Sequence, residues 1–504
     1  MKMRKIGVAG LALALVATAQ VAQPAQAAST DLVIGSVLDI DKLDPHTATN
    51  FATVRALGLV YSGLVEVAGQ NKISPALATS WQFNSNGTSV TLNLRPNVKF
   101  HDGTTFDALD VKASIERIQD SKTGAAARSN LSTITSINAS GLKVTLNMSV
   151  PNAPIIAALD GVNVAMLSAD DIAANKIGGS NKPNGTGPYK FVSWTPTQSV
   201  KLAANDSYYK GAPKIKNITI QVIPNEASIL SAINAGTIQL GILTDPLIAK
   251  QVNSRNAKLQ KVPALGYYAL QFNTKVAPLN DKNVRLAIQC AISRQEVVAT
   301  ALLGEGSITG PITSPNYKSD TNARPCPKQD LAKAKEYLAA SGKKDVTFKA
   351  LVTSTGWATS VAMAQNIKAQ LAKVGITMDL DIVDQATYVP RWLAADFTAT
   401  LANNGGRIDP DTMYTRYFTS AGNLNKVATY SSATLDANFL LGKSSGKTSV
   451  RKGAYTAISK ELEDNAIWVW LATPYEYRVT SRNLSGFTAL VTGSLITLRS
   501  AYLK

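Results

Sequence analysis

A turn rich in glycine and proline runs directly into an aromatic strand in the interior of this 504-residue chain. The segment reads Asn184-Gly185-Thr186-Gly187-Pro188-Tyr189-Lys190-Phe191-Val192-Ser193-Trp194. Glycine and proline favour a tight turn, and the aromatic and branched residues after it favour an extended strand. The fold must therefore contain a sheet with a strand that starts at this turn. A chain of this length also exceeds one ordinary hydrophobic core, so we expect two or three domains or lobes.

Residues 1–27 have the pattern of a secretory signal peptide. Three basic residues precede an apolar run from 6 to 19, and the small residues Ala25 and Ala27 lie at the two positions that signal peptidase reads. We expect cleavage after Ala27. The apolar run is too short for a membrane anchor. Because no cysteine near the cleavage site could carry a lipid, we expect a mature protein that diffuses freely beyond the inner membrane.

The chain is strongly basic, with a formal charge of +17; removing residues 1–27, which hold three Lys or Arg and no acidic residue, leaves +14. Such a charge can serve binding to nucleic acid, anionic lipid or an acidic solute. The basic residues are scattered, however, and no basic stripe with interleaved aromatics is present, as binding of single-stranded nucleic acid needs. We expect no nucleic-acid partner. No later run is long enough for a transmembrane helix, so we expect a protein that is not embedded in the membrane.

Two cysteines, Cys290 and Cys326, are present. In an oxidising compartment an even count favours one disulfide. The bond would close a loop of about 36 residues and contribute roughly 3–4 kcal/mol in the chain-entropy model. Two buried free thiols are the alternative. Neither cysteine belongs to a metal-ligand pattern, and we expect no metal and no cofactor.

Periodicity predicts a chain of mixed α/β class. Asp107 can cap a helix whose apolar residues recur at i, i+4 and i+7 up to residue 118, and Asn225 can cap a second helix that Gly236 ends. Residues 376–382 alternate apolar and polar side chains, which is typical of a strand with one buried face. The repeated order of helix, glycine and strand in the second half indicates an α/β lobe.

Catalytic motifs are weak. The mature chain has two histidines, His46 and His101, and no Gly-x-Ser-x-Gly segment accompanies them. Residues 442–448 resemble a phosphate-binding loop, but one residue between the glycines is missing and no apolar strand precedes them. We expect no catalytic residue and no enzymatic activity; a secreted hydrolase is the alternative from another functional class.

Several segments in order resemble the family 5 extracellular solute-binding proteins, the peptide- and nickel-type receptors of bacterial ABC importers. The turn at 184–189 is similar to the family's GTGPY turn. The further similar segments, spread over nearly the whole mature chain, are Phe100–Phe106 running into Ala108–Val111, Leu270–Thr274, Gly375-Ile376 and Asp409-Pro410-Asp411. Each match alone is weak, whereas all of them in the right order are specific for the family.

The resemblance implies a periplasmic-binding-protein-like fold, in which two lobes close on a ligand in the cleft between them. It implies no catalysis. The boundaries that follow from it are a signal peptide at 1–27, lobe I at 28–50, 180–271 and 481–504, a small inserted subdomain at 51–179, and lobe II at 272–480.

The same resemblance implies partners and a compartment. The protein would capture a peptide-like or small organic solute and deliver it to the permease and ATPase subunits of an importer. We expect a monomer. Because no lipid-anchor cysteine is present, the periplasm is the expected location.

Two anchors for a peptide are missing. Peptide-binding members hold the ligand's amino terminus with an Asp four residues before the proline of the Asp-Pro turn, and that position is Gly406 here. Dipeptide binders place an Arg for the carboxylate near the position of residues 354–357, where no Arg occurs. The sequence therefore argues against ordinary dipeptide specificity. An oligopeptide held through its backbone, or a non-peptide solute such as an opine, a sugar derivative or an organic acid, is left open.

Five residues are candidates for ligand binding. Arg407 can pair with an anionic group through its planar guanidinium, and Trp357 can line the pocket. A surface loop is the alternative for Arg407, and core packing is the alternative for Trp357. Tyr268 and His46 are weaker candidates, and Asp409 would reach the amine-binding position if the register shifted by a few residues.

Overall fold

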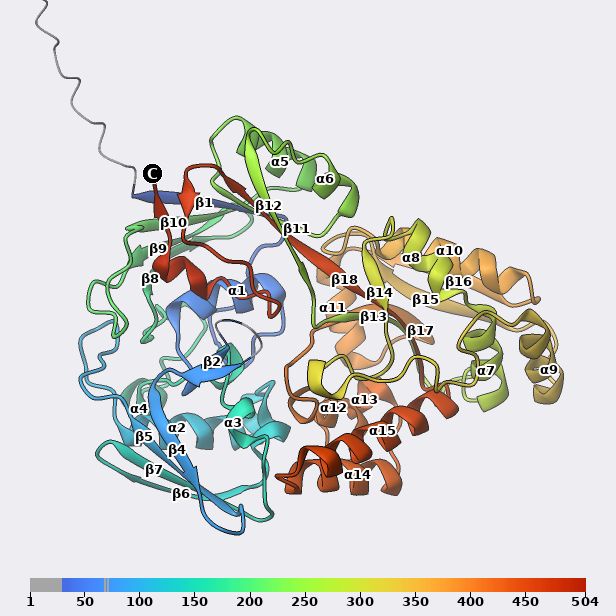
Figure 1. Cartoon of the computed structure of the whole chain (residues 1–504), viewed down its shortest axis with the longest axis horizontal. Helices are drawn as coiled ribbons and strands as arrows, with labels where there is room; N and C mark the ends of the chain where they lie inside the picture. The colour runs from blue at the N-terminus through green and yellow to red at the C-terminus, as the bar shows by residue number, and fades with distance from the viewer. Residues whose placement is uncertain (1–29, 68, 70–71) are drawn as a thin grey trace, which may run out of the picture.

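The computed structural model describes residues 30–67, 69 and 72–504 (Figure 1). The chain forms two lobes, with a subdomain inserted in the first lobe. The predicted signal peptide at 1–27 lies outside the described residues. Among the residues that are described, no helix has the length and apolar character needed to cross a membrane.

One sheet runs through both lobes. Its strand order is β16-β15-β17-β13-β18-β11-β1-β10-β9-β8, and the long strand β18 (Trp468–Ser481) lies at its centre. The first part of β18 pairs with β13 (Tyr267–Phe272), and residues 477–480 pair with β11 (Leu240–Leu243). Figure 1 shows β18 crossing from one lobe to the other. The lobes therefore share a continuous strand.

Lobe I is built on its half of this sheet, with helix α1 (Phe51–Val60) packed against it. The predicted turn at 184–188 leads into β8 as expected. Its glycines permit a close contact, because a Cβ atom at Gly185 would lie 2.1 Å from the carbonyl oxygen of Val60. The Gly187 N–H donates to that same oxygen at 2.8 Å. The other elements of this lobe are β1 (Asp31–Ser36), β8 (Tyr189–Thr195), β9 (Ser199–Ala204), β10 (Asn217–Val222), α5 (Glu226–Asn234), α6 (Pro246–Lys250), β12 (Ala257–Pro263), β19 (Leu484–Ser485) and β20 (Tyr502–Leu503).

The inserted subdomain has a core of its own under a four-stranded sheet, β4-β5-β7-β6. Helix α2 (Ala108–Gln119) begins at the predicted cap, where the Asp107 carboxylate accepts from Leu109 N–H at 2.7 Å. Helix α1 packs in the core of lobe I and not in that of the subdomain. The inserted subdomain therefore begins after Tyr61, later than the predicted boundary at residue 51. Its remaining elements are β2 (Val65–Val67), β3 (Ile73–Pro75), β4 (Ala78–Phe83), β5 (Ser89–Leu94), β6 (Ile134–Ser140), β7 (Lys143–Met148), α3 (Ile155–Ala158) and α4 (Ala169–Ala173).

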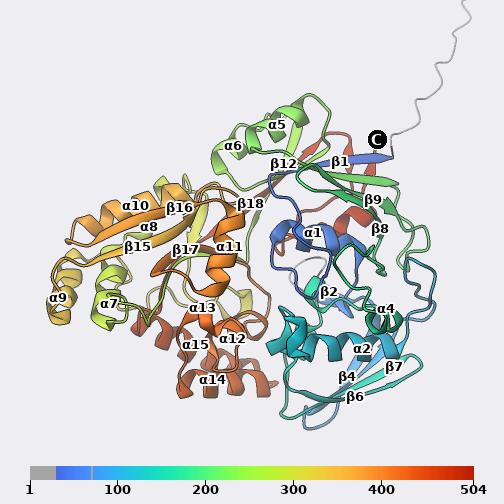
Figure 2. The same cartoon turned by 180° about the vertical axis from the view of Figure 1, so that it is seen from behind.

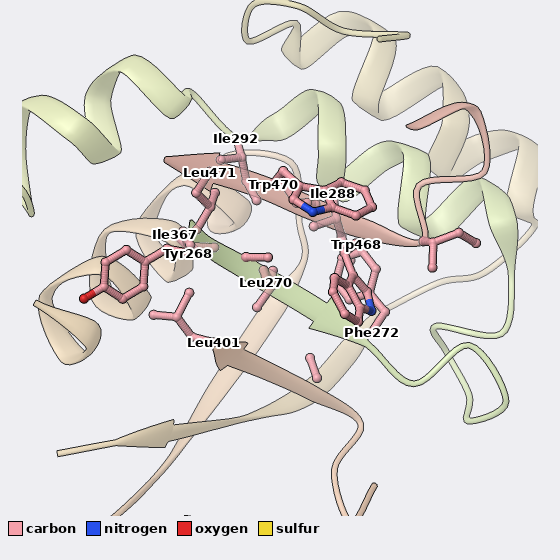
Figure 3. Packing of buried hydrophobic residues seen from close by; sticks show 14 of the residues in the cluster. Tyr268, Leu270, Phe272, Ile288, Ile292, Ile367, Leu401, Trp468, Trp470 and Leu471 are labelled. Atoms are coloured by element: carbon pink, nitrogen blue, oxygen red, sulfur yellow. The ribbon is translucent and has the colours of Figure 1, made fainter. Parts of the chain in front are cut away.

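Lobe II packs helices on both faces of its half of the sheet. Strand β13 is buried along its whole length, and Trp468 and Trp470 of β18 fill the core beside it (Figure 3). The elements are α7 (Lys282–Ala291), α8 (Arg294–Thr300), β14 (Gly306–Ile308), α9 (Leu331–Ser341), β15 (Thr347–Thr353), α10 (Ser360–Ala372), β16 (Thr377–Val383), α11 (Gln385–Ala394), β17 (Ala399–Asn404), α12 (Asp411–Phe418), α13 (Asn425–Ala428), α14 (Ala433–Ser444) and α15 (Thr448–Asp464).

A disulfide joins Cys290, on α7, to Cys326, in the loop before α9. Both residues belong to the buried core of lobe II. The bond closes a 36-residue loop. It therefore fixes this loop against α7.

The chain passes between the lobes at two places. Pro263 ends β12, which pairs with the lobe I half of β18, and Tyr267 begins β13, which pairs with β17 of lobe II. The second crossing lies within β18. Strand pairing therefore places the crossings near residues 264–266 and 473–475, earlier than the boundaries at 272 and 481 that the sequence suggested.

Candidate binding cleft between the lobes

A cavity of about 290 Å³ lies between the lobes. Helix α1 and the C-terminal segment around residues 491–496 form its lobe I side. Strand β2 with residues 62–63 and the segment 160–163 come from the subdomain, and α11, α12 and the loop after β17 come from lobe II. Seen from behind, the subdomain and the helices of lobe II face each other below α1 (Figure 2). The cavity is near the lower end of the size range of small-molecule sites.

The wall from lobe II is largely aromatic. Trp357 lies in the loop after β15 and packs edge-on against Tyr388 of α11, with ring centres 5.4 Å apart. Tyr268 accepts a hydrogen bond from the Thr359 hydroxyl at 3.2 Å, and burial raises its pKa to about 12. Both Trp357 and Tyr268 line the cavity while packing in the lobe II core, so Trp357 combines the two roles that the sequence left open. Trp392 and Tyr417 complete the wall.

Two guanidinium groups of lobe II line the cavity without a carboxylate partner. Arg407 is in the loop after β17, and Arg416 is on α12. Neither side chain forms an ion pair or hydrogen bond with the part of the chain that the structure describes. Burial lowers the pKa of Arg416, and the charge of Arg407 adds to the effect. Buried cations normally have counter-charges, so this wall is suited to an anion.

Gly406 cannot be replaced by the acid that peptide binders use. A Cβ atom at this position would lie 1.9 Å from the carbonyl oxygen of Leu265, on the segment that connects the lobes. Such a distance excludes every side chain without a movement of the backbone. The loop after β17 therefore presents Arg407 to the cavity and has no room for a carboxylate at Gly406.

The carboxylates that line the cavity come from elsewhere, and two of them have strong partners. Glu66 receives hydrogen bonds from Arg499 at 2.7 and 2.8 Å and from Lys210 at 2.8 Å. Burial alone would raise the pKa of Glu66, but these two cations together lower it. Glu476 likewise has a lowered pKa in spite of its burial, because Arg478 and Arg55 lie beside it. Both carboxylates are therefore already paired with other cations and do not form ion pairs with Arg407 or Arg416.

Asp160 is the third carboxylate of the cavity. It accepts the backbone N–H of Val67 at 3.2 Å. Burial raises its pKa to about 6, against the opposing effect of Arg407, and the charge of Glu66 adds to the rise. Asp160 is therefore largely ionised at neutral pH and partly offsets the charge of Arg407 without an ion pair, whereas no carboxylate acts on Arg416 in the same way.

Two of the five predicted site residues lie away from the cavity. His46 is fully buried. Its Nε2 lies 2.9 Å from the Ala165 carbonyl oxygen, and Arg117 donates to its Nδ1 at 2.9 Å. Burial lowers its pKa to about 4. Asp409 accepts two hydrogen bonds from Arg451, at 2.8 and 2.9 Å, inside lobe II. The expectation that these residues face the cleft is wrong, because each is already bound to an internal partner.

The remaining three, Arg407, Trp357 and Tyr268, are brought together around the cavity. Sequence reasoning missed other charged residues of its lining, chiefly Arg55, Asp160 and Arg416. Asp160 stands in an irregular turn before Gly161, which carries no motif. Arg416 offered one signal, its position on the helix that directly follows the Asp-Pro turn.

The cleft, its two-lobed frame and the crossing strands define a solute-binding receptor of the kind that closes around its ligand. The model for bacterial extracellular solute-binding proteins, family 5 (middle), matches residues 72–425. The chain belongs to this family. It is an extracellular or periplasmic solute-binding protein, a receptor that works with the permease and ATPase of an ABC importer.

Similar proteins differ in their ligands. The oligopeptide-binding protein AppA of Bacillus subtilis is 26% identical over 494 residues, which cover 91% of this chain and 88% of AppA. AgaA from A. tumefacien R10, solved with agropinic acid, has 26% identity and a TM-score of 0.87, with 94% of this chain and 99% of AgaA covered. DppA from Helicobacter pylori, solved with the peptide STSA, has 26% identity and a TM-score of 0.85, with 94% and 98% covered.

Proposed function

We propose that this receptor binds a small anionic organic solute in the cleft and delivers it to its permease from the periplasm. One observation carries the proposal. The lobe II wall presents the guanidinium groups of Arg407 and Arg416 with no hydrogen bond or ion pair to the described residues, and Asp160 is the one lining carboxylate whose charge acts on Arg407. An acidic group of the ligand would supply the missing counter-charge, through the bidentate geometry that guanidinium groups favour.

Four features favour an organic acid over a peptide. Gly406 has no space for an amine-binding carboxylate, and the cavity of about 290 Å³ is small for a long peptide. The similar protein AgaA was solved with an acid, agropinic acid, as its ligand. The basic character of the chain would also draw acidic solutes toward the cleft. An oligopeptide held by its backbone is the competing ligand.

The hydrolase alternative has no support at the cleft. His101 is bound away from the cavity, with Nε2 3.0 Å from the Gly187 carbonyl oxygen, and burial lowers its pKa to about 4. His46 is equally enclosed. Neither imidazole can serve as a base for a nucleophile in the cavity, so we propose that the protein binds its solute without chemical change.

Native mass spectrometry of the freshly purified mature protein tests the proposal. Spectra before and after denaturing extraction identify any solute that has co-purified with the protein. A single non-peptide acid is the expected result. A mixture of peptides would overturn the anionic-solute proposal and support an oligopeptide receptor.

Calorimetry of the protein after removal of that solute supplies the second measurement. The extracted acid, added back, should bind with a stoichiometry of one and leave the protein unmodified. Conversion of the added acid into a product would show that the protein is a hydrolase after all.

A further inference from the structure

We infer that the ligand carries two acidic groups, one held by Arg407 and Arg416 of lobe II and the other by Arg55 of lobe I. This inference rests on the proposed function and deepens it. It makes Arg55 a further specificity-determining residue. It also assigns one anion-binding position to each lobe.

Helix α1 presents Arg55 to the cavity by its helical periodicity. Phe51, Val54, Arg55 and Gly58 line the cavity and recur at the spacing of one helix face. The opposite face of α1 packs in the lobe I core. The guanidinium of Arg55 therefore projects from a rigid element, and its side chain is only 11% exposed.

Arg55 interacts only weakly with Glu476, its nearest carboxylate. Glu476 lies 3.6 Å from the Arg55 guanidinium, beyond hydrogen-bond distance. The same Glu476 oxygen accepts a close hydrogen bond from Arg478, on the same strand. Arg55 makes no hydrogen bond with the residues that the structure describes, so its donors are free for a ligand. Glu476 would keep Arg478 as its partner if Arg55 turned to an acid.

The excess of positive charge near the cavity favours a ligand with more than one acidic group. Three cationic side chains, Arg55, Arg407 and Arg416, line the cavity with three carboxylates, Glu66, Asp160 and Glu476. Three further cations outside the lining, Lys210, Arg478 and Arg499, pair with Glu66 and Glu476. Three positive charges therefore have no carboxylate of their own. A ligand with one acidic group would compensate one of these charges, and a diacid would compensate two. Compensation matters because a partly buried charge without a partner costs free energy.

Phe51 lies close both to Arg55 and to the loop that carries Arg407. The guanidinium carbon of Arg55 lies 5.8 Å from the centre of the Phe51 ring. A Cβ atom at Gly405, two residues before Arg407, would lie 3.6 Å from Cε1 at the edge of the same ring. The middle part of the ligand would thus lie over an aromatic ring, with one acidic end on each lobe. A solute of this form bridges the cleft and favours its closure.

The test uses protein freed of its solute by unfolding in guanidinium without reductant and refolding, so that the disulfide stays intact. The probes are glutarate, adipate and pimelate, each compared with its monoamide by titration calorimetry. For the probe that binds best, we expect the diacid to bind roughly 10- to 100-fold more tightly than its monoamide, the range for one charge-assisted hydrogen bond. Equal affinities would overturn the inference.

Arg55→Gln locates the second acidic group. In this variant the advantage of the diacid over its monoamide should shrink to within about twofold, whereas Arg255→Gln, at an exposed arginine outside the cavity, should keep the full advantage. Equal weakening of diacid and monoamide by Arg55→Gln would also overturn the inference. If no probe binds, the acidic groups of the extracted solute are counted by mass spectrometry, and fewer than two overturns it.

Failure of the proposed function gives a different pattern. In that case Arg407→Gln changes the affinity for no acid, and the extracted solute has no acidic group. If only the inference fails, an acid binds through Arg407 and the second head group makes no difference.

Discussion

Arg407 is the residue on which the binding proposal depends most directly. Its side chain forms no hydrogen bond or ion pair with the described residues, so Arg407→Ala removes none. We expect the free energy of unfolding to stay within about 0.5 kcal/mol of wild type. The affinity for the co-purified acid should fall by roughly 10- to 100-fold, because a charge-assisted hydrogen bond is lost.

Titration calorimetry and thermal unfolding check both parts. Arg255→Ala is the matched control, since Arg255 is exposed and lies outside the cavity. An unchanged affinity in Arg407→Ala would remove Arg407 from the site. A large loss of stability would mean that the side chain has a structural role instead.

Asp160 should make stability depend on pH. Burial raises its pKa from 3.8 to about 6 in the folded protein, so between these values the native state binds more protons than the unfolded state. The contribution of Asp160 to the free energy of unfolding therefore falls as pH rises through this window. We expect Asp160→Asn to stabilise the ligand-free protein by about 1 to 3 kcal/mol at pH 7.5 and to have little effect at pH 4.

Chemical denaturation at the two pH values measures the difference. Asp206→Asn, at an exposed aspartate whose side chain is 74% exposed, is the control and should give the same small change at both. A stabilisation that does not vary with pH would contradict the assignment of the shift to Asp160. The same protonation should strengthen binding of an acid as pH falls toward 6, because it removes a negative charge facing Arg407 and leaves Glu66 paired with its two cations.

At the level of elements, hydrogen bonds connect the subdomain directly to lobe II across the cleft. Asn130, in the turn before β6, donates to the Thr412 carbonyl on α12 at 3.0 Å. From the lobe II side, the side chain of Asn423 donates to the Ala125 and Ala126 carbonyls, which directly precede the short helix of Asn130, at 3.4 Å. A movement that separates the subdomain from lobe II would break these bonds, so they should contribute to ligand affinity.

Asn130→Ala tests this contribution. One neutral hydrogen bond is worth about 0.5–1.5 kcal/mol, so the affinity for the acid should fall roughly 2- to 10-fold. Asn138→Ala, at an exposed position of the same subdomain, should bind as wild type does. Equal affinities of the two variants, measured by calorimetry, would show that the turn does not stabilise the closed state.

Local chemistry made some elements predictable. The Asn225 side chain accepts the Ser228 N–H at 2.8 Å and starts α5, and the Asp107 cap starts α2, both as the sequence indicated. Such caps depend on residues that are neighbours in the chain. The pairing of Asp409 with Arg451 depends on α15 folding against the Asp-Pro turn, which no local pattern records. The Asp-Pro turn could therefore be predicted, whereas the role of its carboxylate could not.

At the scale of the whole molecule, the cleft joins three separate parts of the chain. Arg55, Asp160 and Arg416 meet there from lobe I, the subdomain and lobe II. The overall two-lobed plan could be predicted, because family motifs recur in order along the sequence. The charge balance of the cavity could not, since it depends on which carboxylates already have partners in the folded protein.

Closure of the two lobes is the remaining prediction. The only covalent crossings within the described chain are the segment between β12 and β13 and strand β18, and a rotation about these two strands would open the cleft. A ligand with one acidic end bound to each lobe would oppose that rotation.

Addition of the co-purified acid should therefore reduce the radius of gyration measured by small-angle X-ray scattering. At 100 times Kd it should also raise the free energy of unfolding by about 2.7 kcal/mol. Arg407→Ala at the same ligand concentration should show a smaller change in both quantities. A radius that stays constant while the acid binds would mean that the lobes are already closed without it.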